Sequence, residues 1–224
     1  MSSNLGQQAR NTARVRSLFA AALVLGGAFG TVTPAVAQKV TAPPTPEAIT
    51  PPVGNTAFLV GHARGSQGYI CLPDPASGGT SWTINQPRPE ATLFVDLFGE
   101  PIQIITHFAS VDESPNDFAP NPVSLGGNAT WQSSFDSSKV WAVATGHVDA
   151  GTDESCPNGG AIPCLRLQSI GNQEGPSGGK ILAKATFVQR LNTKGGAAPT
   201  TACLVGQTQL VPYTADHFFF RANE

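Results

Sequence analysis

The chain has little charge and few of the residues that build long helices. Only 12% of its 224 residues are Asp, Glu, Lys or Arg, and it holds 24 glycines and 19 prolines but a single methionine. Beyond residue 37, no window repeats apolar residues with the 3.6-residue period of an amphipathic helix, and this frequency of glycine and proline would interrupt one. The sequence therefore predicts a domain without helical architecture.

Motifs for nucleotides and nucleic acids are also missing. There is no G-x-G-x-x-G sequence and no Walker loop, so we expect no nucleotide cofactor and assign no other cofactor. The first 37 residues hold three of the 13 basic residues and none of the 15 acidic ones, which leaves 10 basic and 15 acidic residues in the remainder. Because these basic residues are scattered and outnumbered, we expect no nucleic-acid partner.

Residues 1–37 have the layout of a cleavable secretory signal peptide. Arginines come first, an apolar run follows at 18–32, and Ala35-Val36-Ala37 precedes Gln38. The apolar run is shorter than the ~20 residues that a membrane-spanning helix needs. We expect cleavage to leave a secreted or periplasmic protein without a membrane span; an uncleaved N-terminal anchor is the alternative.

The rest of the chain is predicted to be a Pro-rich lead-in at 38–53 followed by one β-domain at 54–224. The lead-in holds five prolines, which favour an extended backbone. After it, short apolar runs are separated by Gly, Pro, Asn and Asp, which is typical of strands. The predicted strands are 57–60, 91–98, 102–108, 139–147, 180–191 and 216–221. We expect an all-β, single-domain sandwich or barrel of mainly antiparallel strands with long Gly/Pro-rich loops.

One hairpin can be placed residue by residue. The sequence Phe98-Gly99-Glu100-Pro101 predicts a two-residue type II′ turn at Gly99-Glu100. Pairing outward from this turn sets His107 opposite Thr92, about 13 Å along the strand from Asp96. That distance excludes a His107–Asp96 dyad. His107 is then either a half-buried sheet residue or a member of a pocket formed with another strand.

All four cysteines lie beyond the signal peptide, so an exported chain would carry them into an oxidising compartment as disulfides. Cys156 and Cys164 flank a short loop whose closure costs little entropy, which favours a local pair. Cys71 would then pair with Cys203. A zinc site is the alternative, but the sequence has no C-x-x-C pair, and we assign no metal site.

Two short patterns resemble catalytic or metal motifs. Residues 175–179 match G-x-S-x-G, but this stretch leads into a predicted strand rather than a helix, so we interpret it as a Gly/Pro turn. His147 and Asp149 share one face of an extended strand next to an acidic loop. A metal site usually needs three or more converging ligands, so we interpret this loop as solvated.

Four stretches together resemble the domain of unknown function 3455 family. They read ITPPVG at 49–54, HARGSQGYIC at 62–71, QRLNTKGGAAP at 189–199 and PYTADHFFF at 212–220. The resemblance implies an exported protein, as in bacterial and fungal members. Some relatives carry a malate dehydrogenase label, which the missing dinucleotide fingerprint does not support. Ile-Pro-Trp is common in the family where Ile162-Pro163-Cys164 stands here, which implies that the Cys156–Cys164 pair is a local addition.

A disulfide between Cys71 and Cys203 would bring the family's motifs together, and this convergence defines the predicted site. Its ligand-binding candidates are Tyr69, Arg190, Asn192, Tyr213 and Asp216, together with His107. One interpretation is a small-ligand pocket. The other is that Arg190 and Asp216 form an ion pair while the neighbouring residues shape a turn.

The residues favour a binding protein over an enzyme. The expected ligand is an unknown small molecule or surface polymer. A secreted enzyme is the first alternative, and it would be favoured by His62, His107 or His217 lying within hydrogen-bond distance of Asp216 or Asp96. A structural protein that interacts with the cell envelope is the second, and it would show a large exposed apolar patch.

Overall fold

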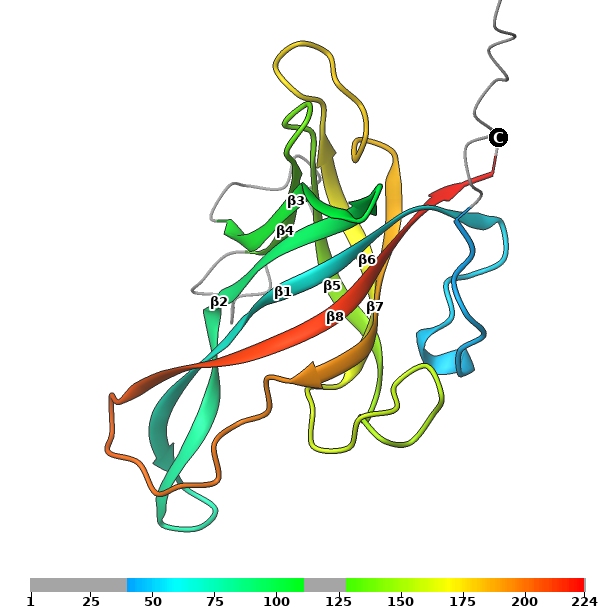
Figure 1. The fold of residues 1–224 in the computed structure, drawn as a ribbon. Coiled ribbons are helices and arrows are strands. Elements are labelled where there is room, and N and C mark those ends of the chain that lie inside the picture. Colours follow the sequence, from blue (N-terminus) through cyan, green and yellow to red (C-terminus); the bar gives the residue numbers. More distant parts are fainter. Residues whose placement is uncertain (1–39, 111–127, 224) are drawn as a thin grey trace, which may run out of the picture. The chain divides into compact units, whose positions relative to one another are not determined.

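The barrel is built from eight antiparallel strands, each paired with the next in sequence, and the last strand pairs with the first to close the sheet (Figure 1). The computed structural model describes residues 40–110 and 128–223, apart from the side chains of 86–89. The strands are β1 (Asn55–Asp74), β2 (Gly79–Leu97), β3 (Glu100–Ser110), β4 (Asn128–Ser133), β5 (Lys139–Val148), β6 (Cys164–Gln173), β7 (Ala185–Gly195) and β8 (Thr208–Ala222). The all-β, single-domain prediction is confirmed, and of the two architectures left open the barrel is the one formed.

The signal-peptide prediction at 1–37 lies outside the described residues. Within the described part, no helix is long and apolar enough to cross a membrane. The helical content there is one short 3-10 turn, η1 (Glu47–Ile49).

Alternate residues of each strand point into the barrel, where they form the main core. Leu93, Ile105, Val188 and Phe219 are fully buried there. At Gly65, β1 has no side chain. A Cβ built on Gly65 would lie 2.0 Å from the Glu90 carbonyl oxygen of β2. Only glycine therefore allows β1 and β2 to approach this closely.

A second apolar cluster lies on the outside of the barrel, under the lead-in. Ile49 is fully buried there against Phe218 and Phe220 of β8. Gln189 of β7 also faces outward, and its side-chain amide donates to the Ile49 carbonyl at 2.8 Å. Phe218 and Phe220 therefore share the outer face of β8, whereas Phe219 lies on the inner face in the main core.

Both predicted disulfides are present. Cys156–Cys164, the local disulfide, spans eight residues beside β7, whereas Cys71–Cys203, the long-range disulfide, spans 132. The long-range disulfide lies in an arm where β1, β2 and β8 continue beyond the barrel (Figure 1). It fixes the segment before β8 to β1, with support from a bond between the Cys71 N–H and the Gln207 carbonyl.

The predicted strands 57–60, 91–98 and 216–221 are only parts of the longer β1, β2 and β8, and three further corrections are needed. β4 and β6 were missed, because β4 has only six residues and β6 alternates leucines with polar residues that gave no apolar run. The predicted strand at 180–191 begins only at Ala185, because residues 181–184 form turns. The Gly99-Glu100 turn is wrong: Phe98 and Gly99 both have positive φ, which makes a type I′ turn one residue earlier.

Candidate functional site

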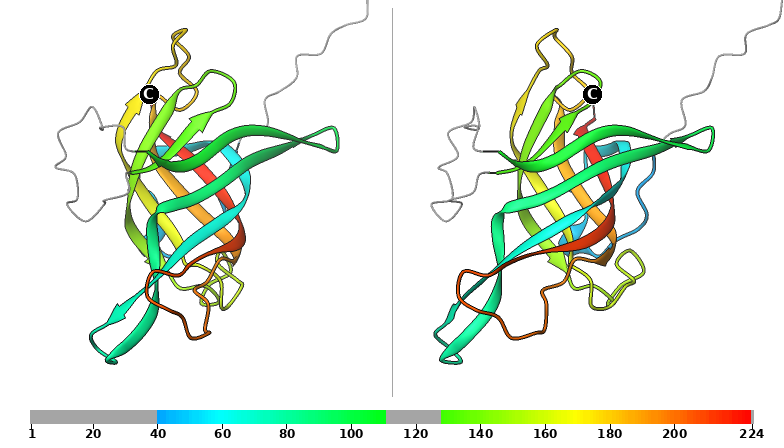
Figure 2. Two further views of the ribbon diagram at one scale, coloured as in Figure 1. Left: turned by 90° about the vertical axis from the view of Figure 1, so that its left-hand side faces the viewer. Right: turned by 60° about the vertical axis from the view of Figure 1, so that its left-hand side comes forward.

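A groove opens in the barrel wall where β2 parts from β3. The last pair between these strands is Ala91 with His107. In the residues of β2 before Ala91 the described pairs are with β1 alone, and in the residues of β3 after His107 they are with β4 alone. Residues 85–88 of β2 face the single residue Gly68 of β1, so β2 is bulged and bends away (Figure 2). Pro87 lies in this stretch and Pro89 follows it, and neither has an N–H to donate to a neighbouring strand.

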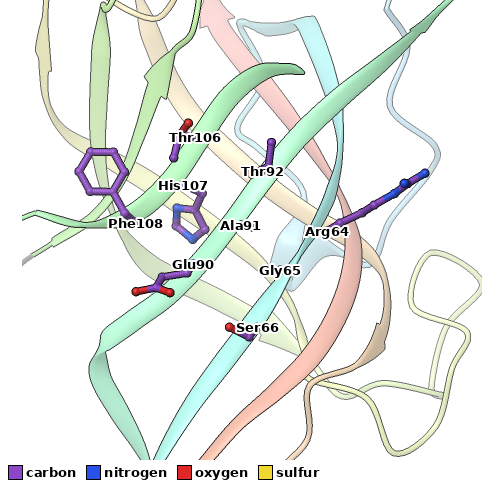
Figure 3. A pocket seen from close by; sticks show the side chains of 9 residues that line it. All are labelled: Arg64, Gly65, Ser66, Glu90, Ala91, Thr92, Thr106, His107 and Phe108. Carbon is purple, nitrogen blue, oxygen red and sulfur yellow. The ribbon is translucent and has the colours of Figure 1, made fainter. Parts of the chain in front are cut away.

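The groove has a volume of about 480 Å³, and six of the nine residues that line it are polar, although apolar atoms form most of its surface (Figure 3). Three strands supply its lining: Arg64, Gly65 and Ser66 from β1, Glu90, Ala91 and Thr92 from β2, and Thr106, His107 and Phe108 from β3. Hydroxyls, two charges of opposite sign and one aromatic ring therefore surround the opening. Among the six predicted ligand-binding residues, His107 alone belongs to this lining.

His107 is the groove's innermost polar group. Its ring lies in the gap between β2 and β3 (Figure 3) and is stacked on Trp131, with ring centroids 4.3 Å apart. Its Nδ1 lies 2.8 Å from the Thr130 carbonyl oxygen. Because a carbonyl can only accept, Nδ1 carries the proton.

Burial lowers the pKa of His107 to about 4; the bond to Thr130 opposes this shift and the charge of Arg190 adds to it. The imidazole is therefore neutral at neutral pH, and its Nε2 is an acceptor. The register of the prediction was one residue off: the turn at Phe98-Gly99 shifts the pairing by two residues and the bulge at Ile104 restores one, which sets His107 opposite Ala91 rather than Thr92. The conclusion that His107 and Asp96 do not pair is unchanged.

Behind His107, a second imidazole lies fully inside the barrel. His217 of β8 is 1% exposed, and its ring meets that of His107 edge-on at 5.6 Å. Trp131 donates its indole N–H to His217 Nδ1 at 2.9 Å. Burial, together with the neighbouring His107 imidazole and the Arg190 charge, holds the pKa of His217 well below its usual value.

Arg190, Tyr69 and Tyr213 form the polar end of the barrel interior. Arg190 is the strand partner of His217, and one of its terminal nitrogens donates to the Pro163 carbonyl at 2.8 Å. Burial raises the pKa values of Tyr69 and Tyr213, and the Arg190 charge partly offsets this. Burial lowers the pKa of Arg190, and the two phenols oppose the shift. These three predicted residues are thus electrostatically coupled.

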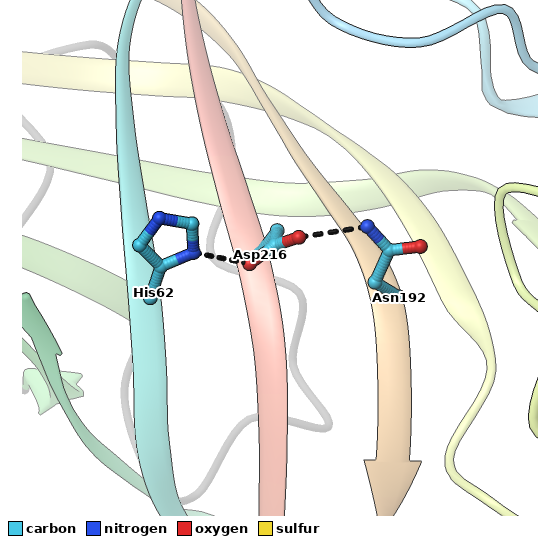
Figure 4. Close-up of polar contacts among 3 residues, drawn as sticks. All are labelled: His62, Asn192 and Asp216. Carbon is cyan, nitrogen blue, oxygen red and sulfur yellow. Dashed lines mark hydrogen bonds and ion pairs between the residues drawn. The ribbon is translucent and has the colours of Figure 1, made fainter. Parts of the chain in front are cut away.

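Asn192 and Asp216 belong to a separate, outward-facing site (Figure 4). Asp216 accepts from His62 Nδ1 at 2.6 Å through one carboxylate oxygen and from Asn192 at 2.7 Å through the other. The His62 side chain is 58% exposed and that of Asp216 23%. A histidine is therefore held on the outer surface by a carboxylate that is itself oriented by an amide.

The predicted site is therefore split between the two faces of the wall. Asn192 has a left-handed backbone, φ 50°, and β7 shifts register between Leu191 and Lys194, so Arg190 and Asn192 do not share a face. The expected ion pair between Arg190 and Asp216 is wrong, because Asp216 binds His62 and Asn192 instead.

Sequence reasoning missed Trp131 as a functional candidate, and it named His62 only as one of three histidines that could meet Asp216. The structure brings His62 to 2.6 Å from Asp216. Trp131 lies on β4, which gave no strand signal. His62 lies in the second family motif and Asp216 in the last, but only the β1–β8 pairing that closes the barrel sets them opposite each other.

The two other short patterns have no catalytic geometry in the described residues. Residues 175–179 form a turn, closed by a bond from the Gly175 N–H to the Gly179 carbonyl, as expected. No group of three or more metal-ligand side chains converges in the part of the chain that the structure describes, which includes His147 and Asp149.

The comparison with known proteins gives a family. A family model described as a protein of unknown function, DUF3455, matches residues 52–221 and so covers every strand of the barrel. No curated protein and no solved structure matches the chain. The matched span includes the groove, the polar interior and the His62–Asp216 pair. The chain belongs to the DUF3455 family.

Proposed function

We propose that this is an exported binding protein that holds a small polar molecule, or a short piece of a surface polymer, in the groove between β2 and β3. The observation that carries the proposal is a groove in the wall of a closed barrel that ends on a buried, neutral imidazole. Eight-stranded barrels enclose just enough space for side chains or one small ligand.

The lining supports a polar ligand. Thr92, Thr106 and Ser66 offer hydroxyls, and His107 offers an acceptor nitrogen at the inner end. Phe108 adds an aromatic face, against which a sugar or another ring could pack. A volume of about 480 Å³ lies in the range of small-molecule sites.

Ligand binding can be tested by NMR with a panel of mono- and oligosaccharides and small neutral aromatic amides. We expect a member of the panel to shift the Thr92, Thr106 and His107 resonances saturably. Phe108→Ala should weaken that binding, whereas Phe135→Ala, which removes an exposed ring from the β4–β5 turn, should not. Resonances that stay unchanged across the panel at millimolar concentration would contradict the proposal.

Export is part of the proposal. The N-terminal arginines, apolar run and small-residue site favour a signal peptide, and two disulfides are compatible with an oxidising compartment. N-terminal sequencing of the natural protein should begin at Gln38. A sequence that begins at Met1 or Ser2 would contradict cleavage.

A second candidate function is general-base catalysis at the outer surface. It is favoured by the 2.6 Å contact between His62 and Asp216, which would leave His62 Nε2 to take a proton. Hydrolysis of p-nitrophenyl acetate tests it: His62→Asn should abolish a rate above background, whereas His147→Asn should not. Equal rates for wild type and His62→Asn would eliminate this candidate.

A further inference from the structure

Arg190 carries a positive charge inside the barrel wall that no described carboxylate neutralises. Its pKa responds to the phenols of Tyr213 and Tyr69, and in the described part of the chain it forms no ion pair. One terminal nitrogen is bonded to the Pro163 carbonyl, but Nε is inaccessible to solvent and has no partner. A buried charge without a counter-charge is strongly unfavourable, so the site is incomplete as it stands.

His217 supplies a second donor without a partner. Its Nδ1 accepts from the Trp131 indole, which is a donor only, so Nδ1 carries no proton. Because burial keeps this imidazole neutral, the proton must be on Nε2. This Nε2 is buried and has no hydrogen-bond partner.

The two unpartnered N–H groups belong to strand partners. Arg190 and His217 are paired across β7 and β8, so their side chains leave the sheet on the same face. Both groups donate, so the missing partner must accept. A water molecule could satisfy the hydrogen bonds, but only an anion would also neutralise Arg190.

We propose that the barrel interior binds an oxyanion, the carboxylate or phosphate group of a small ligand, between Arg190 and His217. This rests on the proposed binding function and deepens it by naming the ligand's charge and its anchor. The ring of His107, which lines the groove, is 5.6 Å from that of His217, so the groove and the anion site are adjacent. A ligand in the groove would direct its anionic end toward Arg190.

Titration calorimetry with benzoate, inorganic phosphate and benzamide tests the proposal on the folded chain with both disulfides intact. Benzamide matches benzoate in shape but carries no charge. We expect saturable binding of benzoate or phosphate and at least about tenfold weaker binding of benzamide. Benzoate alone would indicate a carboxylate ligand, and phosphate alone a phosphorylated one.

Arg190→Gln should weaken anion binding about tenfold or more, whereas Arg221→Gln, which removes an exposed cation from β8, should leave it unchanged. If Arg190→Gln does not fold, the Arg190 Nε–H and His217 Nε2–H proton signals of the wild type decide: both should shift on adding benzoate. Anion binding that is unchanged in Arg190→Gln would overturn the inference. So would Arg190 Nε–H and His217 Nε2–H signals that do not shift while anions bind elsewhere.

The outcomes separate this inference from the proposed function. If neutral molecules bind in the groove, with no preference for anions and no dependence on Arg190, the anion site is wrong and the proposed binding function is supported. A chain that binds neither neutral nor anionic probes would remove both.

Discussion

The two buried imidazoles predict that the folded state loses stability in mild acid. His107 is 4% exposed, and its pKa in the folded chain is about 4 against an ordinary value of 6.5. As pH falls below 6.5 the unfolded chain takes up a proton that the folded chain cannot, so unfolding becomes easier. The contribution of the neutral His107 to the free energy of unfolding is fully present above pH 6.5 and is lost as pH falls to about 4.

The size of the loss follows from these two pKa values. Between pH 7 and pH 4.5, His107 alone should remove about 2.5 kcal/mol from the free energy of unfolding. His217 should add to this loss, because its pKa in the folded chain is also lowered. A few kcal/mol is a large part of the stability of a typical domain.

Urea unfolding followed by tryptophan fluorescence at the two pH values measures the effect. His107→Asn keeps a donor for the Thr130 carbonyl but does not titrate, so it should lose about 2.5 kcal/mol less than wild type over this interval. His147→Asn, at an exposed position of β5, should behave like wild type. A difference below about 1 kcal/mol between wild type and His107→Asn would refute the argument that burial keeps this ring neutral.

Three further predictions concern stability. Burial raises the pKa of Asp136, but hydrogen bonds from the Ile181 and Ser138 N–H groups and from serine hydroxyls outweigh this effect and lower the pKa to about 2. Asp136→Asn should therefore lower the free energy of unfolding by about 2 kcal/mol at pH 7, measured by urea unfolding. The difference between the two proteins should shrink as pH falls from 3.8 to 2. Gly65→Ala should cost about 3 kcal/mol because its Cβ would overlap β2, whereas Gly79→Ala, whose Cβ would have its nearest neighbour at 3.5 Å, should be almost neutral. Replacing the long-range disulfide by two alanines should cost about 5 kcal/mol and replacing the local one about 2.5, because the loops that they close differ in length; equal losses in thermal unfolding would contradict this.

The fold class could be predicted from the sequence because it depends on local patterns. Short apolar runs between Gly and Pro indicate strands, and the four cysteines allow only three pairings, of which a short loop favours one. The alternation in β8 even separated Phe218 and Phe220, which pack outside under the lead-in, from Phe219 in the core. What local patterns do not contain is closure, and the β1–β8 pairing that makes the sheet a barrel has no sequence signal of its own.

The candidate site was predicted only in part, for the same reason. The two-residue period of a strand predicts that Arg190 and Asn192 of β7 lie on the same face. The left-handed backbone of Asn192 breaks this period, so the two side chains lie on opposite faces. Asn is among the residues that most readily adopt this conformation, but it does so in few of its occurrences. The position of the Phe98-Gly99 turn and the bulge at Ile104 together change the partner of His107. Single irregularities therefore decide which side chains meet, and patterns averaged over a strand do not reveal them.

The distribution of polar groups inside the barrel argues against a purely structural role. One part of the interior is filled by apolar side chains of the main core, among them Leu93, Ile105, Val188 and Phe219. If stability were the only requirement, apolar side chains at Arg190 and His217 would serve better than a cation without a counter-charge and an N–H group without a partner. Departures from self-consistent packing are expected where a protein meets something else. The hairpin tip at Phe98, 98% exposed, does present an apolar side chain to solvent. The unsatisfied donors behind the groove therefore favour a ligand within the barrel.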